Sequence, residues 1–255
     1  MHAIWVIGKN TFREIIRDRI LYGLLVFALI LIGLSLAMGQ LSFTEQARIS
    51  VDFGFAAMNL SAIIIAIFVG SNLVTKEIEQ RTVYTLLVRP LSRSQFLLGK
   101  VLGLAFVNIV VLLGLSIVLT AILFSIGQPW DMDCTFVVLG VLCESLVVLS
   151  VTLLFGAYSK PMLAVAFSIG VFLVGRSMDS LDFFAQKSES AFFIGFNYVL
   201  QRSLPNLSKF SWGNYPLIED KVPLQPFLMS VIYGMGWMGV CITLTALILR
   251  KRDFT

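Results

Sequence analysis

The sequence predicts an all-α integral membrane protein with six transmembrane helices, and its composition is the first observation behind this prediction. Hydrophobic residues make up 58% of the 255 residues, and charged residues make up only 13%. About a quarter of the residues are charged in a typical soluble domain. The mean hydropathy of the chain is +0.90. This balance excludes an ordinary soluble globular fold.

Long uncharged runs are the second observation, because a helix needs roughly 20 apolar residues to cross a bilayer core. Four such runs carry no charge, a fifth is interrupted only by Glu144, and a shorter sixth begins at Pro161 and borrows from its flanks. No linker separates a soluble domain, so residues 1–255 are predicted to form a single transmembrane domain. The predicted spans are residues 20–38, 53–74, 101–125, 134–157, 161–176 and 227–249.

Residues 3–19 are predicted to form an amphipathic helix at the membrane surface. Apolar residues such as Trp5 and Phe12 recur at helical spacing, and polar residues such as Arg13 and Arg17 lie opposite them. Such a helix lies in the headgroup plane, with its aromatic rings toward the lipid and its cations near anionic headgroups. The alternative is that these residues simply extend the first span.

Lysine and arginine are unevenly distributed between the two sides of the predicted bundle. With the N-terminus in the cytoplasm, thirteen of the nineteen basic residues fall on the cytoplasmic side. Of the other six, four lie in one long outer loop and Arg176 lies directly before it, and the positive-inside rule is weak for long loops. We therefore predict cytoplasmic N- and C-termini. The net charge of +4 follows from this topology and does not indicate a nucleic-acid partner.

The residues that enzyme chemistry would need are nearly absent. The single histidine, His2, rules out a His-based triad or a zinc-protease helix, and the three cysteines have no paired spacing. The chain contains no P-loop. Its one GxGxxG match, residues 234–239, lies inside an apolar run, where it favours close helix packing. We predict no catalytic, cofactor-binding or metal site in this chain.

Glu144 is the one ionisable residue well inside a predicted span. A carboxylate inside the membrane is costly and by default indicates a functional site. It is a candidate for the substrate path along the fourth span, or for an ion pair with Arg176 near the outer end of the fifth. The alternative is a protonated side chain that is hydrogen-bonded within the bundle.

The charged segment 75–100 lies between the second and third spans and holds five of the nineteen basic residues. Its first half is compatible with a helix, and Arg89-Pro90 ends that helix because the residue before a proline avoids the helical region. Ser92 is a plausible N-cap for a second helix that continues into the third span. A kinked segment of this kind can pass force from a soluble partner into the membrane. The alternative is a solvated basic loop that meets only lipid headgroups.

The predicted outer segment, residues 177–226, is rich in aromatic residues. Aromatic side chains favour the membrane–water interface. We predict one or two short helices within residues 181–200, lying on the outer leaflet as a cap over the bundle and ending before Pro205. This segment is also the candidate surface for a periplasmic partner.

Residues 76–100 follow the pattern K-E-I-E-x-R-T-x-Y-T-L-L-x-x-P-x-S-R-x-x-F-x-L-G-K. This pattern resembles the signature after the second span of type-2 ABC exporter permeases. It is similar in particular to the single six-span permeases of bacteria, including copper-processing and gliding-motility permeases. The resemblance extends to the N-terminal amphipathic helix, the six spans and the large outer segment before the last one.

This resemblance implies a permease subunit of an ATP-driven exporter in the bacterial inner membrane. Two copies would pair with two copies of a cytoplasmic ABC ATPase, which would hold the ATP and Mg²⁺. The alternative is a mechanotransmitter or assembly anchor that drives a periplasmic or surface machine without moving a solute. In either case the sequence does not identify the substrate or cargo. The residues implied to couple to the ATPase are Glu77, Glu79, Arg81, Thr82, Leu86, Leu87, Arg89, Pro90 and Arg93.

Overall fold

The computed structural model describes residues 2–40, 46–79, 93–128, 130–188, 191–213 and 221–251. All regular elements in these ranges are helical, which confirms the predicted all-α class. The elements are α1 (His2–Ile16), α2 (Arg19–Gln40), α3 (Gln46–Glu79), α5 (Arg93–Ser125), α6 (Met132–Tyr158), α7 (Pro161–Arg176), α8 (Met178–Lys187), α9 (Ala191–Ser203), the short 3-10 helix η1 (Ser208–Phe210) and α10 (Leu224–Lys251).

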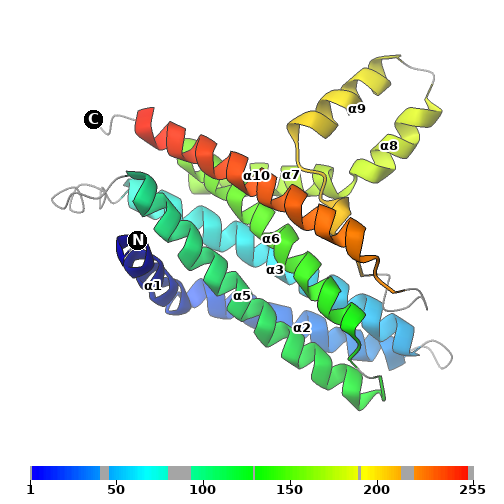
Figure 1. Cartoon of the computed structure of the whole chain (residues 1–255). Helices are drawn as coiled ribbons and strands as arrows, with labels where there is room; N and C mark the ends of the chain where they lie inside the picture. The colour runs from blue at the N-terminus through cyan, green and yellow to red at the C-terminus, as the bar shows by residue number, and fades with distance from the viewer. Residues whose placement is uncertain are drawn as a thin grey trace.

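The long helices lie side by side in an elongated bundle (Figure 1). The short helix α1 and the two chain termini lie at the same end of this bundle, which we call the α1 end. The helices α8 and α9 form a hairpin that projects from the side of the bundle toward the opposite end (Figure 1). This arrangement agrees with an even number of membrane crossings.

Five helices are long and apolar enough to cross a membrane, and a sixth crossing results if α7 and α8 form one span bent by 53°. The predicted fifth span, whose apolar run is short, corresponds to α7, the first helix of this bent pair. Helix α7 has the bounds that the sequence predicts and begins with Pro161 at its first position, where the missing N–H of proline is tolerated. Helix α3 begins at Gln46, earlier than the predicted span of 53–74.

Helices α3 and α6 form the centre of the bundle. Of the 18-residue apolar stretch in each helix, 61% is buried in α3 and 67% in α6, compared with 22% in α2 and 17% in α10. The small residues Ala62 and Ala66 of α3 are buried, and a Cβ added to Gly70 would lie 3.0 Å from Leu149 of α6. Small residues allow the close helix approach that stabilises bundles in lipid. The second span therefore packs closely within the bundle, with Gly70 against α6.

The segment after α7 contains the two short helices that the sequence predicts, α8 and α9. Asp182 of α8 accepts hydrogen bonds from Asn197 and Gln201, which hold the hairpin together. The chain then returns to the bundle, where the backbone N–H of Leu207 donates to the carbonyl oxygen of Gly175 at 3.0 Å. Phe210 is buried at this point. The aromatic segment is therefore divided between a projecting hairpin and a part packed into the bundle.

Candidate functional site

Half of the predicted coupling segment, residues 80–92, lies outside the described residues. This applies to Arg81, Thr82, Leu86, Leu87, Arg89 and Pro90. Glu77 and Glu79 belong to the last turns of α3, and Arg93 is the first residue of α5, directly after the predicted N-cap. Figure 1 places the end of α3 and the beginning of α5 at the α1 end of the bundle. The roles of all nine residues stay predictions.

Glycine residues bring α1 into direct backbone contact with the first turns of α5. A Cβ added to Gly103 would lie 2.7 Å from the carbonyl oxygen of Gly8, and a Cβ added to Gly99 would lie 2.7 Å from the Cβ of Ile7. Such distances are too short for any side chain larger than hydrogen. Helix α1 is therefore seated on the helix that follows the coupling segment.

Two side-chain contacts reinforce the seating of α1 on α5. Lys100 Nζ lies 3.6 Å from Glu14 Oε2, and the Lys100 side chain is largely buried. The rings of Phe12 and Phe106 meet edge to face with their centroids 5.1 Å apart, a geometry that aromatic pairs prefer. Among the residues predicted for the membrane interface, Phe12 is thus half-buried against α5.

Trp5, Arg13 and Arg17 remain exposed on the other side of α1. The exposed fraction of Trp5 is 66%. This division gives α1 one face against α5 and one face free for the headgroup zone. Helix α1 thus has an apolar side and a polar side, as the sequence predicts, and its apolar side is docked on α5.

A buried polar cluster lies deep within the bundle and is centred on Glu144. The Glu144 side chain has no exposed surface. Nη1 of Arg176 lies 3.1 Å from both carboxylate oxygens, and the side-chain amide of Asn59 donates to Oε2 at 2.6 Å. The cluster thus joins three helices, α3, α6 and α7. Of the alternatives that the sequence left open, the structure shows the pair with Arg176.

A second polar contact adjoins the Glu144 cluster on α6. The side-chain amide of Asn108 on α5 donates to the hydroxyl of Ser145 at 2.7 Å, and this hydroxyl donates in turn to the carbonyl oxygen of Leu142. Asn108 Oδ1 is buried and accepts no hydrogen bond from the described residues. Sequence reasoning missed both Asn59 and Asn108. The only signal available was the presence of amide residues within two apolar runs.

Replacing Asn108 with alanine is expected to lower the free energy of unfolding by about 0.5–1.5 kcal/mol, the usual range for one hydrogen bond between membrane helices. The loss stays small because the hydroxyl of Ser145 keeps its bond to Leu142. Stepwise SDS titration in mixed micelles measures this loss. The control is Ser116→Ala, which removes a hydroxyl bonded only to its own helix. Equal unfolding curves for the two variants would contradict a contribution from the Asn108–Ser145 contact.

The described residues, the Glu144 cluster included, show no metal-binding constellation. No group of three or more His, Cys, Asp or Glu side chains comes together in the described ranges. The glycines of the GxGxxG match lie within the single helix α10, and an added Cβ on Gly234 would lie 3.0 Å from the ring of Phe210. A dinucleotide site needs this motif between a strand and a helix. Packing against Phe210 is therefore the physical interpretation of Gly234, whereas an added Cβ on Gly236 or Gly239 meets no heavy atom within 4 Å.

A bundle of bent and straight membrane helices, with a short helix seated at one end and a buried polar cluster inside, defines a multi-pass membrane subunit. The family model for ABC-2 family transporter proteins matches residues 5–177. Because this match covers more than half of the chain, the protein belongs to the ABC-2 transporter family. No match was found among the curated proteins.

Family membership identifies the chain as a permease subunit of an ABC transporter, which associates with an ABC ATPase and with the membrane. The matched residues extend from α1 to the residue after α7. They include the glycine contact between α1 and α5, the coupling segment, and the whole Glu144 cluster. The hairpin α8–α9 and helix α10 lie beyond the matched residues.

Proposed function

We propose that this protein is the permease subunit of an ATP-driven exporter and couples ATP hydrolysis by a separate ATPase subunit to movement of a substrate. The observation that carries this proposal is the seating of α1 on the first turns of α5. Glu14 and Lys100 connect the two helices at 3.6 Å. A partner that moves the coupling segment would therefore displace α1 and α5 together.

The proposed orientation places the α1 end in the cytoplasm of a bacterial cell, with the bundle in the inner membrane. The positive-inside distribution of lysine and arginine supports it. Two copies of this chain and two copies of a cytoplasmic ABC ATPase form the proposed complex, and the ATPase holds the ATP and Mg²⁺. ATP binds more tightly to the closed ATPase dimer, and this difference supplies the bias between conformations.

Glu144 is the proposed residue on the substrate path. In the present conformation Arg176 and Asn59 cover its carboxylate. Arg176 is the last residue of α7, directly before the bend into α8. A movement of this bend would change the contact between the two charges, and the pair is thus positioned to respond to the conformational cycle.

Reconstitution with the ATPase encoded nearest to this gene tests the proposal. We expect the purified permease alone to hydrolyse no ATP, and the assembled complex in proteoliposomes to hydrolyse ATP and move a substrate outward. Replacing Arg89 and Pro90 with alanine should leave the complex assembled but reduce its hydrolysis-linked transport. ATP hydrolysis by the permease alone would contradict the proposal, as would transport that is unaffected by this variant.

The hairpin α8–α9 favours a second candidate function, a mechanotransmitter that drives a periplasmic machine. Phe183, Phe184 and Phe192 on this hairpin are more than half exposed, and the hairpin projects away from the bundle (Figure 1). Exposed aromatic surface is typical of interaction sites. ATP hydrolysis that requires a periplasmic protein bound to residues 177–226, without movement of any solute, would favour this function over export.

A further inference from the structure

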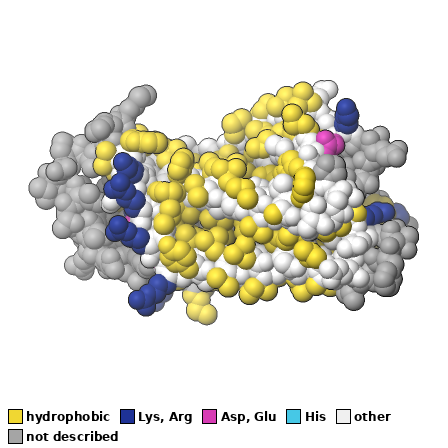
Figure 2. All heavy atoms as spheres, turned by 90° about the horizontal axis from the view of Figure 1, so that it is seen from below, with side chains coloured by type: hydrophobic (Ala, Val, Ile, Leu, Met, Phe, Trp, Pro, Cys, Tyr) yellow, Lys and Arg dark blue, Asp and Glu magenta, His cyan; other side chains and the backbone are white. Residues whose placement is uncertain are grey.

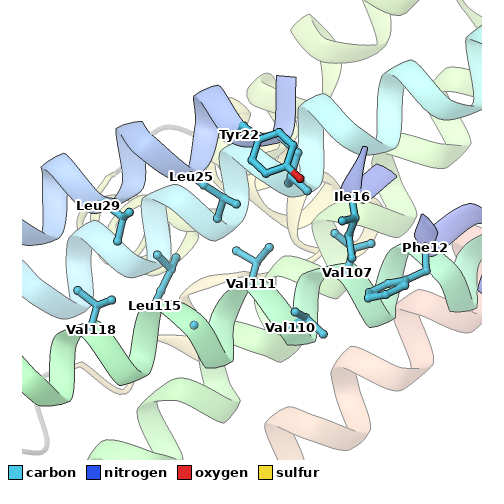
Figure 3. A pocket seen from close by; sticks show the side chains of 12 residues that line it. Phe12, Ile16, Tyr22, Leu25, Leu29, Val107, Val110, Val111, Leu115 and Val118 are labelled. Carbon is cyan, nitrogen blue, oxygen red and sulfur yellow. The ribbon is translucent and has the colours of Figure 1, made fainter. Parts of the chain in front are cut away.

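An apolar groove lies between α2 and α5 and is closed at one end by α1. It has a volume of about 400 Å³. Side chains from the three helices point into it (Figure 3). Its lining includes Phe12, Tyr22, Leu25, Val111, Gly114 and Val118. The Tyr22 hydroxyl is the one polar side-chain group among the lining residues, so the groove offers almost no hydrogen bonds to water.

The length of the groove matches one leaflet of a bilayer. On α5 it extends from Val107 to Val118, which at a rise of 1.5 Å per residue is about 16 Å. Half of a hydrocarbon core of about 30 Å is about 15 Å. The groove begins beside Phe12 and Ile16 of α1, at the end of the bundle where the headgroups of that leaflet would lie.

Basic residues surround the end of the groove that α1 closes. Arg13 and Arg17 directly follow the lining residues Phe12 and Ile16, and both are exposed. Lys9 and Arg19 are exposed as well. The nearby carboxylates are engaged, since Glu14 pairs with Lys100 and Asp18 accepts a hydrogen bond from the backbone N–H of Ile20.

Figure 2 shows this side of the molecule. Hydrophobic side chains cover most of its length, and Lys and Arg side chains gather at the α1 end. An anionic group at this end would face several positive charges, and an apolar chain attached to it would continue over a hydrophobic surface. This is the charge and shape pattern of a phospholipid in one leaflet.

We propose that the groove binds one acyl chain of an anionic phospholipid, whose phosphate contacts Arg13 and Arg17. Apolar cavities do not hold water, and lipid chains are the apolar material available at this depth. Arginine is well suited to bind phosphate because its guanidinium can donate two parallel hydrogen bonds. The bound lipid fills the gap between α2 and α5 next to the seated α1. The proposal is independent of the direction of transport.

The test for the acyl chain uses Gly114, which lines the groove. A Cβ added to Gly114 meets no heavy atom within 4 Å, so a phenylalanine there can begin without a backbone clash and place its ring in the groove. Gly33 on α2 is the matched control, because an added Cβ there is equally free and Gly33 does not line the groove. The full chain is purified in nanodiscs of phosphatidylglycerol and phosphatidylcholine with identical acyl chains. Native mass spectrometry then counts the lipids that remain bound.

We expect wild type and Gly33→Phe to retain one phosphatidylglycerol. Gly114→Phe should retain at least about fivefold less, because an acyl chain would have to displace the phenylalanine ring from the groove. Equal retention in Gly114→Phe and wild type would overturn the proposal. Cross-linking of two copies through Val110→Cys would also overturn it, because the groove would then be covered by a second copy of the chain.

The test for the headgroup uses the double variant Arg13→Gln with Arg17→Gln. Each basic residue near an anionic surface contributes roughly fivefold to lipid binding. We therefore expect the preference for phosphatidylglycerol over phosphatidylcholine to fall by about fivefold or more, while one lipid of either kind stays bound. An unchanged preference would overturn the assignment of the phosphate to these arginines.

Discussion

Replacing Arg176 with alanine is expected to lower the free energy of unfolding by about 2–3 kcal/mol. This is less than the usual cost of removing one partner from a fully buried ion pair, because the Arg176 side chain is 37% exposed. The Glu144 carboxylate has no exposed surface, and Arg176 Nη1 is 3.1 Å from both of its oxygens. Without the guanidinium, the carboxylate keeps only the Asn59 amide. Helix α7 also loses a polar contact with α6, although Phe167 still packs against Phe155 of α6.

The double variant Arg176→Ala with Glu144→Gln separates the charge effect from the loss of packing. A neutral amide at position 144 removes the unpaired charge, so the double variant should be more stable than Arg176→Ala alone. Arg202→Ala is the control, because Arg202 is an exposed arginine on α9. SDS titration and the yield of folded protein give the measurement. If Arg176→Ala unfolds like Arg202→Ala, the buried pair does not stabilise the bundle.

Sequence analysis identifies the two charged residues of the Glu144 cluster but not its amide residue. Glu144 stands out because it interrupts an otherwise apolar run, and Arg176 was identified as a partner because it ends the next span. Asn59 and Asn108 carry no comparable signal. A neutral amide occurs in many positions, and its partner depends on how each helix is rotated about its axis. Apolar periodicity fixes this rotation only weakly when a helix is apolar all round.

The segment after α7 shows the same limit at a larger scale. Its aromatic composition predicts short helices, and α8 and α9 are present. The direction of the hairpin depends on pairwise contacts, such as Leu207 N–H with the Gly175 carbonyl and Asn206 with Asp179. A composition pattern contains no information about these contacts. The predicted cap is therefore correct in its elements but does not describe their division between hairpin and bundle.

Helix α1 combines a predictable pattern with an unpredicted contact. The alternation of apolar and basic residues predicts an amphipathic helix, and Gly99 and Gly103 predict close packing at the start of the third span. That these two glycines receive Gly8 of α1 follows only from the structure. Glycine has no side chain, so the sequence gives no charge or shape pattern that would identify these glycines as partners. The contact places α1 on the first turns of α5, the helix that includes the last residues of the predicted coupling segment.

Replacing Gly103 with leucine is expected to uncouple ATP hydrolysis from transport in the assembled complex. A Cβ at this position would lie 2.7 Å from the Gly8 carbonyl oxygen and 2.7 Å from the Cβ of Thr11, so α1 must shift away from α5. Overpacking of this kind costs about 1–3 kcal/mol, which changes a two-state equilibrium by roughly 5- to 150-fold. The population with α1 seated on α5 should fall accordingly.

The measurement compares ATP hydrolysis and transport in the same proteoliposomes. Because the polar cluster around Glu144 lies deeper in the bundle, the Gly103→Leu permease should remain folded and bound to its ATPase while transport per ATP hydrolysed falls. Gly33→Leu is the control, since an added side chain at that position has free space. Transport per ATP that equals that of Gly33→Leu would show that the seating of α1 has no part in force transmission. If transport per ATP falls only in Gly103→Leu, α1 and α5 move as one unit, because this substitution removes no charged or hydrogen-bonding side chain.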